Sequence, residues 1–194
     1  MIDTAHYNLK KKSGRYYVIQ VSSGTESVTE TYIRKYVSKE SYSEMFHPMR
    51  LVRKKFRGVW KDVHQKLLPG YIFVKTSNPE IFFTELKKVP KMTKMLGSDR
   101  EYFVALNDDE EKWLLWLLDK CHGSETNPYT DYEVGLSYVE FDENDRISIV
   151  SGPLLGVEGE IKRINKHKRL AEIETTFMGN VIRVSMGLEL IKPR

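Results

Sequence analysis

The stretch KLLPGYIFVKT at residues 66–76 constrains the fold more than any other part of the chain, because it predicts a strand that is apolar on both faces. Side chains alternate across a strand, so Ile72 and Val74 point to one face and Phe73 to the other. The run YYVIQV at 16–21 has the same pattern. An antiparallel sheet usually buries one face and wets the other, so the second face needs another cover, either from the chain itself or from a separate protein. The embedded Pro-Gly pair either ends one element or marks the entry to this strand.

Three further segments carry helix signals. Ser23 and Glu26 have the spacing of a capping box, which predicts a helix directly after the 16–21 strand. Pro79 is typical of the first position of a second helix. Residues 107–120 place acidic side chains first and apolar side chains at helical spacing after them, which predicts a third helix.

The remaining segments read as strands. A long hairpin is expected over 45–76, with its tip near Arg57-Gly58. From Arg146 onward apolar residues alternate with polar ones, which is typical of short strands. About fifty residues with several short strands suggest a small β-barrel, in which closure removes exposed sheet edges.

Charge is distributed in blocks along a chain whose net charge is only +4. Residues 47–75 are strongly basic, residues 119–145 are acidic, and the balance turns basic again after residue 146. This order suggests two basic modules with an acidic connector. Basic patches favour nucleic acid or another polyanion as a partner, although many surface charges only solvate a face.

Several motifs together resemble those of the NusG family of transcription factors. They are an aromatic pair at the start of the first strand, a glycine before the first helix, LLPGYIFVKT, and VSGPLLGVEGEIKRIN followed by short strands. The resemblance covers about 14–120 and 146–194. The long basic hairpin, the acidic connector and the basic barrel loop are similar to those of the specialised LoaP-type branch, which promotes antitermination at particular operons.

The resemblance implies an α+β fold with two modules. The first is an NGN-type α/β sandwich around a four-stranded antiparallel sheet, and the second is a KOW-type small SH3-like β-barrel. The expected boundaries are 1–13 for an N-terminal tail, 14–121 for an NGN-like RNA polymerase-binding domain, 122–145 for an acidic linker and 146–194 for a KOW domain.

The resemblance also implies partners and contact residues. The second apolar sheet face would dock on the clamp helices of RNA polymerase, and Pro69-Gly70 would mark a strand entry. On this interpretation Tyr71 and Phe73 are substantially exposed. The expected polymerase contacts are Tyr16, Val18, Leu68, Tyr71 and Phe73.

Two basic clusters are candidate nucleic-acid contacts. Lysine and arginine bind phosphates, and an arginine fork can also read base edges in structured RNA. The barrel loop is the expected reader of a structured leader RNA, with Arg169 discriminating between RNAs; the hairpin could lie near upstream DNA or could only keep itself soluble. The loop set is Lys162, Arg163, Lys166, His167, Lys168 and Arg169, and the hairpin set is Arg53, Lys54, Lys55, Arg57 and Lys61.

Enzyme motifs are missing from the sequence. There is no Rossmann or P-loop glycine pattern, no nucleophile elbow, and no HxxxH or CxxC pair. We therefore expect no enzyme activity, no cofactor and no metal. A hydrolase using Cys121 and His122, a nuclease, a housekeeping NusG-type factor and a ribosome-associated KOW protein are the alternatives.

The location follows from composition. No stretch approaches the roughly 18 apolar residues of a membrane span, and the N-terminal residues have no signal-peptide core. The single cysteine fits a reducing compartment. We expect a cytoplasmic monomer without membrane contacts.

Overall fold

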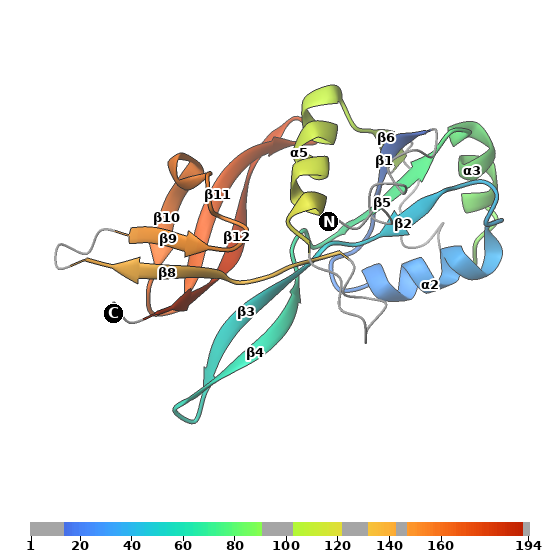
Figure 1. Ribbon diagram of the computed structural model, residues 1–194. Helices are drawn as coiled ribbons and strands as arrows, with labels where there is room; N and C mark the ends of the chain where they lie inside the picture. Colours follow the sequence, from blue (N-terminus) through green and yellow to red (C-terminus); the bar gives the residue numbers. More distant parts are fainter. Residues whose placement is uncertain (1–13, 91–102, 122–131, 143–146, 192–194) are drawn as a thin grey trace, which may run out of the picture. The chain divides into compact units, whose positions relative to one another are not determined.

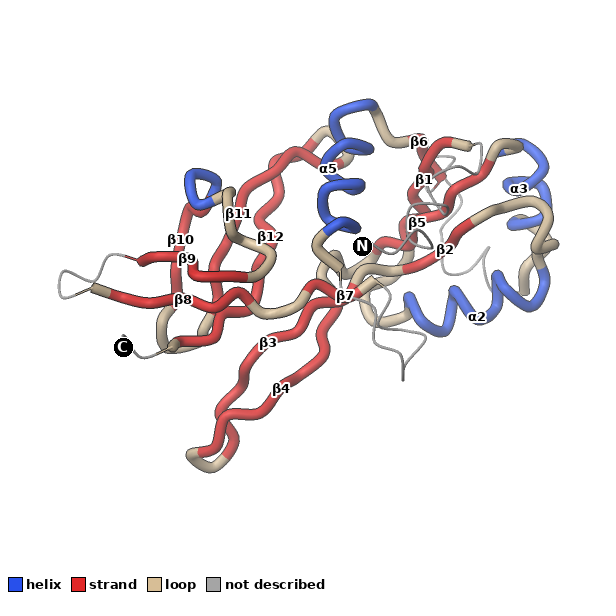
Figure 2. Tube along the Cα trace, in the orientation of Figure 1, coloured by secondary structure: helices blue, strands red, loops and turns tan. Residues whose placement is uncertain are grey.

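The computed structural model describes residues 14–90, 103–121, 132–142 and 147–191, and its contacts divide the chain into two compact units. Residues up to His47 and residues 69–107 belong to the first unit; residues 48–68 and those from Asp108 onward belong to the second. Figure 1 labels the elements, and Figure 2 separates helices from strands. The expected tail at 1–13 lies outside the described residues.

Within the described residues, the first unit is a four-stranded antiparallel sheet with the order β2-β5-β1-β6 and two helices. Ile19, Ile72 and Val74 of the sheet pack in one buried cluster with Ile33 and Phe82 of the helices. The helices therefore cover one apolar face, as the sequence pattern requires. The strands are β1 (Arg15–Gln20), β2 (Glu44–Phe46), β5 (Tyr71–Thr76) and β6 (Phe103–Ala105), and the helices are α2 (Glu26–Tyr36) and α3 (Pro79–Leu86).

The Pro-Gly pair marks the entry to β5. Gly70 has a φ of +91°, which favours glycine, and its carbonyl accepts a hydrogen bond from the amide of Val21 at 2.8 Å. The Gly70 amide donates to the carboxylate of Glu26 at 2.6 Å, and the Gly24 amide donates to the same carboxylate. Glu26 is fully buried and is the first residue of α2, so the helix begins later than the Ser23 capping box predicts.

The second unit combines three sequence-distant parts. A five-stranded sheet with the order β10-β11-β12-β8-β9 forms the small C-terminal barrel, and β3 and β4 form a hairpin whose tip is Arg57-Gly58, as predicted. Both tip residues have positive φ, as a tight two-residue turn requires. The elements are β3 (Met49–Phe56), β4 (Val59–Lys66), α5 (Asp108–Asp119), β7 (Glu133–Val134), β8 (Ser137–Phe141), β9 (Ile147–Ser151), the 3₁₀ turn η2 (Glu158–Glu160), β10 (Ile161–Asn165), β11 (Leu170–Phe177) and β12 (Asn180–Leu190).

The hairpin and α5 pack against the C-terminal strands. A Cβ added to Gly187 of β12 would lie 2.2 Å from the carbonyl oxygen of Leu51 in β3, so only glycine allows this approach. The amide of Met178 donates to the Glu110 carboxylate of α5 at 2.6 Å. Residues 48–68 and α5 thus group with the barrel, whereas the sequence analysis placed them in the first module.

The described architecture confirms the expected α+β fold, with a four-stranded antiparallel sheet and a small C-terminal barrel. Part of the acidic segment expected to be a linker is strand, because β7 pairs with β3 and β8 pairs with β12. None of the helices within the described ranges is long and apolar enough to cross a bilayer.

Candidate nucleic-acid interface

The second apolar face of the first sheet is buried. Phe73 has no exposed surface, and Tyr16 and Val18 are exposed by 3% or less. The ring of Phe46 in β2 stacks on Phe73 with centroids 5.6 Å apart and meets Tyr16 edge-on at 6.4 Å. Tyr16 also donates from its hydroxyl to the Glu44 carboxylate at 2.6 Å.

The expectation that Tyr71 and Phe73 are substantially exposed is therefore wrong for Phe73, while Tyr71 is half-buried. Phe46, which lies within the segment predicted as a single long hairpin, is the cross-strand neighbour of Phe73 and packs beside it on the same face. Leu68 is also buried and belongs to the second unit.

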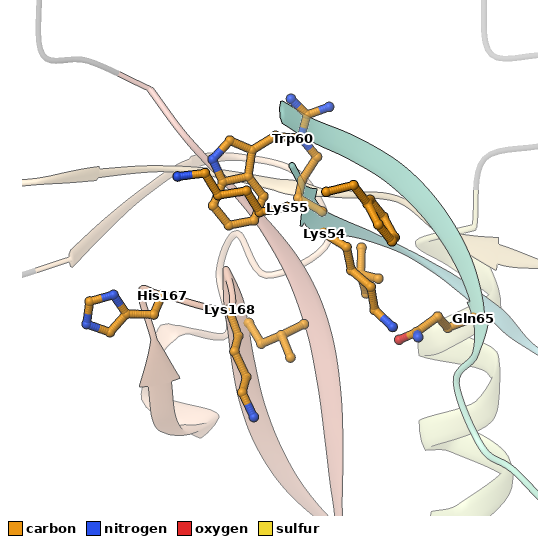
Figure 3. A pocket seen from close by; sticks show the side chains of 10 residues that line it. Lys54, Lys55, Trp60, Gln65, His167 and Lys168 are labelled. Atoms are coloured by element: carbon orange, nitrogen blue, oxygen red, sulfur yellow. The ribbon is translucent and has the colours of Figure 1, made fainter. Parts of the chain in front are cut away.

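The two basic clusters predicted separately line one pocket in the second unit. The pocket has a volume of about 470 Å³ and lies between the β3–β4 hairpin and the turn before β11. Figure 3 shows Lys54, Lys55 and Gln65 on the hairpin side, with His167 and Lys168 on the turn. Three residues of the predicted hairpin set, Arg53, Lys54 and Lys55, thus line the same pocket as His167 and Lys168 of the predicted loop set.

Aromatic side chains contribute to the same pocket. Phe56, at the end of β3, is 50% exposed, and Trp60 lies across the strand pair from Lys55. Both rings line the pocket. The sequence analysis considered only the cations of the hairpin, although the segment KKFRGVWK interleaves them with aromatics, and this interleaving is a signal for stacking on bases.

A cluster of charges joins the hairpin to the barrel beside this pocket. The Glu189 carboxylate on β12 contacts the Arg169 guanidinium at 2.5 Å and the Arg53 guanidinium at 2.6 Å. The Arg169 guanidinium also lies 3.9 Å from the ring centroid of Trp60. Arg53 donates to Asp62 at 2.6 Å, and this bond, together with the charge of Glu189, raises the pKa of the Arg53 guanidinium.

Arg169 is consequently held by protein groups. Its side chain is only 14% exposed, it bonds to Glu189, and it covers one face of Trp60. We had expected this arginine to read base edges. In the structure its guanidinium instead fixes the turn and the hairpin relative to each other.

The other predicted loop and tip residues do not line the pocket. Lys162 and Arg163 are exposed on β10, and Arg57 is exposed at the hairpin tip. The ammonium of Lys166 lies 4.2 Å from the ring centroid of Phe141. Among the described residues, no group of three His, Cys, Asp or Glu side chains is placed to hold a metal ion.

Comparison with known proteins gives the family. The model of the family described as "Transcription termination factor nusG" matches residues 14–114, just over half of the chain. The chain belongs to the NusG family.

Relatives in the NusG family align with this chain over most of its length and most of their own. "Transcription termination/antitermination protein NusG" of Rickettsia bellii is 23% identical over 98% of this chain and 96% of its own length. The protein of the same name from Vibrio vulnificus is 22% identical over 89% and 91%. A solved structure entitled "Domain interaction in Thermotoga maritima NusG" has 20% identity, covers 90% of this chain and 94% of its own, and has a TM-score of 0.46.

Proposed function

We propose that this protein is a transcription termination/antitermination factor that acts by binding RNA polymerase. The match of the NusG family model to residues 14–114, together with relatives that span nearly the whole chain, carries this proposal. A small barrel that follows the first sheet in the sequence gives the protein a second surface, which is needed if one part binds polymerase and another binds RNA.

The first sheet is the proposed polymerase-binding element, with the clamp helices as the partner. Tyr71 is the accessible member of the predicted set, since it is half-buried at the start of β5. Tyr16, Val18 and Phe73 of this sheet are buried beside it, and Leu68, the remaining member of the set, is buried in the second unit. Tyr71→Ala should therefore weaken binding of purified polymerase while leaving the far-ultraviolet circular dichroism spectrum unchanged.

The finer proposal is a specialised, LoaP-like antiterminator that recognises a structured leader RNA through its barrel. The basic pocket supports it, because cations from the hairpin and from the barrel turn line it together. Phosphate contacts of this kind provide affinity that falls steeply with salt. The hairpin tip, with Arg57 and Lys61 exposed, could additionally lie near upstream DNA.

In vitro transcription with purified polymerase tests both levels of the proposal. The template carries a structured leader followed by a terminator, and read-through is measured with and without the protein. Increased read-through that disappears when the leader hairpin is scrambled supports the specialised role. An effect that ignores the leader supports a housekeeping NusG-type factor. If the protein leaves transcription unchanged and sediments with ribosomes, a ribosome-associated role replaces the proposal.

A further inference from the structure

We propose that the pocket between the β3–β4 hairpin and the 166–169 turn binds an unpaired nucleotide of a structured RNA. This inference rests on the proposed RNA-binding role and specifies its ligand and its residues. It assigns the reading of RNA to a site built by two segments that are more than one hundred residues apart, rather than to the barrel turn alone.

The dimensions and the lining suit a base. A volume of about 470 Å³ lies within the roughly 300–1,000 Å³ that is typical of small-ligand sites. Phe56 and Trp60 provide aromatic surface, and every base has a face that can stack on such rings. The amide of Gln65 and the imidazole of His167 can donate to or accept from the polar edge of a base. A base inside a continuous duplex is stacked on both sides and could not enter.

The charges around the pocket suit the phosphates on either side of that base. Lys54 and Lys55 approach from the hairpin, and Lys168 approaches from the turn. Contacts between ammonium groups and phosphates give an affinity that falls steeply with salt, so this site should show that dependence.

The pocket is held in shape by the charge cluster beside it. Arg169 covers one face of Trp60, and Glu189 ties Arg169 and Arg53 together. Trp60 therefore keeps its orientation before any ligand arrives. A ring that is already fixed loses less conformational freedom on binding, which favours affinity.

The register of the hairpin supplies matched controls. Lys54 lines the pocket, whereas Lys61, its cross-strand neighbour of equal charge, does not. Phe56 lines it, whereas Val59, its exposed apolar neighbour across the turn, does not. Lys54→Gln and Lys61→Gln remove the same charge, and Phe56→Ala and Val59→Ala each remove an exposed apolar side chain.

The experiment uses the full chain and three labelled probes: an RNA hairpin with a purine bulge, the same hairpin without the bulge, and the bulged hairpin made of DNA. Fluorescence anisotropy gives the affinity for each at two salt concentrations. We expect the wild type to prefer the bulged RNA by about tenfold, on the scale of one base stacking on an aromatic ring. Phe56→Ala should erase that preference and Val59→Ala should keep it. Lys54→Gln should lower affinity and reduce the salt slope by about one unit, and Lys61→Gln should do so much less.

Equal affinity of the wild type for bulged and fully paired RNA would overturn the proposal, and so would equal effects of the two lysine variants. Equal binding of the bulged DNA would overturn the assignment to RNA. Thermal unfolding of each variant shows that the fold is intact, which we expect because all four side chains are exposed. Failure of the proposed function has a different signature: the bulged RNA binds as described, but the protein leaves read-through by polymerase unchanged.

Discussion

Replacing Glu189 by glutamine should destabilise the second unit strongly, because one carboxylate there serves two arginines. Glu189 is 17% exposed and contacts Arg169 at 2.5 Å and Arg53 at 2.6 Å. Hydrogen bonds to charged groups are worth about 1.5–3 kcal/mol each. The glutamine side chain has one acceptor oxygen and no negative charge. The Arg169 side chain, which is only 14% exposed, would therefore lose the opposite charge that pairs with it. We expect a loss of about 2–3 kcal/mol in the free energy of unfolding.

Urea unfolding followed by tryptophan fluorescence measures this loss. The protein has three tryptophans, Trp60, Trp113 and Trp116, and all of them lie in the second unit, so the signal reports on that unit alone. With a urea dependence of about 2 kcal/mol per molar, the midpoint should fall by about 1–1.5 M. The fluorescence of folded Trp60 should also change, because its ring loses a fixed guanidinium at 3.9 Å.

Asp62→Asn is the matched control. Asp62 contacts the same Arg53 at the same 2.6 Å, but it is 50% exposed, against 17% for Glu189. Exposed ion pairs contribute little, so this variant should leave the midpoint nearly unchanged. Equal shifts for the two variants would refute the reasoning, since partial burial of Glu189 would then have no consequence. A Glu189→Gln midpoint within error of the wild type would show that the charge cluster does not hold hairpin and barrel together.

Four further predictions concern the residues Cys121, Glu26 and Gly152. Burial, with the charge of Glu133 as the smaller cause, raises the pKa of the Cys121 thiol to about 12, so native protein at pH 8 should react with a thiol reagent about a thousandfold more slowly than denatured protein. The folded state holds the Cys121 thiol proton up to a higher pH than the unfolded state does. The free energy of unfolding, compared with that of Cys121→Ala, should therefore be unaffected below about pH 9 and should fall by about 1.4 kcal/mol per pH unit between pH 9 and 12. Urea unfolding at a series of pH values measures this fall. Glu26→Ala should leave the buried amide of Gly70 without its 2.6 Å acceptor and lower the thermal midpoint by several degrees in calorimetry. Gly152→Ala should destabilise the barrel, measured by tryptophan fluorescence, because the new Cβ would lie 2.5 Å from a backbone oxygen at a φ of +97°.

Local signals in the sequence predicted most of the elements. The hairpin tip at Arg57-Gly58 and Pro79 at the start of α3 follow from turn and capping chemistry, which depends on neighbouring residues only. Alternation after residue 146 likewise predicted strands of the barrel between β9 and β12, whereas β8 lies in the segment expected to be a linker. The sequence pattern also showed that β5 is apolar on both faces, and both faces are buried.

Packing between distant segments could not be predicted in this way. Nothing local to β3 indicates that it approaches Gly187, because that contact requires the absence of a side chain more than one hundred residues later. The contacts of Arg169 within the protein could not be predicted for the same reason. From the sequence alone, an arginine in a basic turn indicates a nucleic-acid contact. Only the structure shows that the carboxylate of Glu189 and the ring of Trp60 contact Arg169.

The neutralised arginines change how the basic surface must work. Two cations that we expected to contact nucleic acid, Arg53 and Arg169, are each paired with carboxylates, so the remaining positive charge at the pocket comes from its lysines. An ammonium group senses charge but lacks the planar fork that reads a guanine edge. Discrimination between RNAs at this surface must then come from shape, that is, from which RNA offers a nucleotide that can leave its stack and enter between the hairpin and the turn, and from bonds of Gln65 and His167 to the edge of that base.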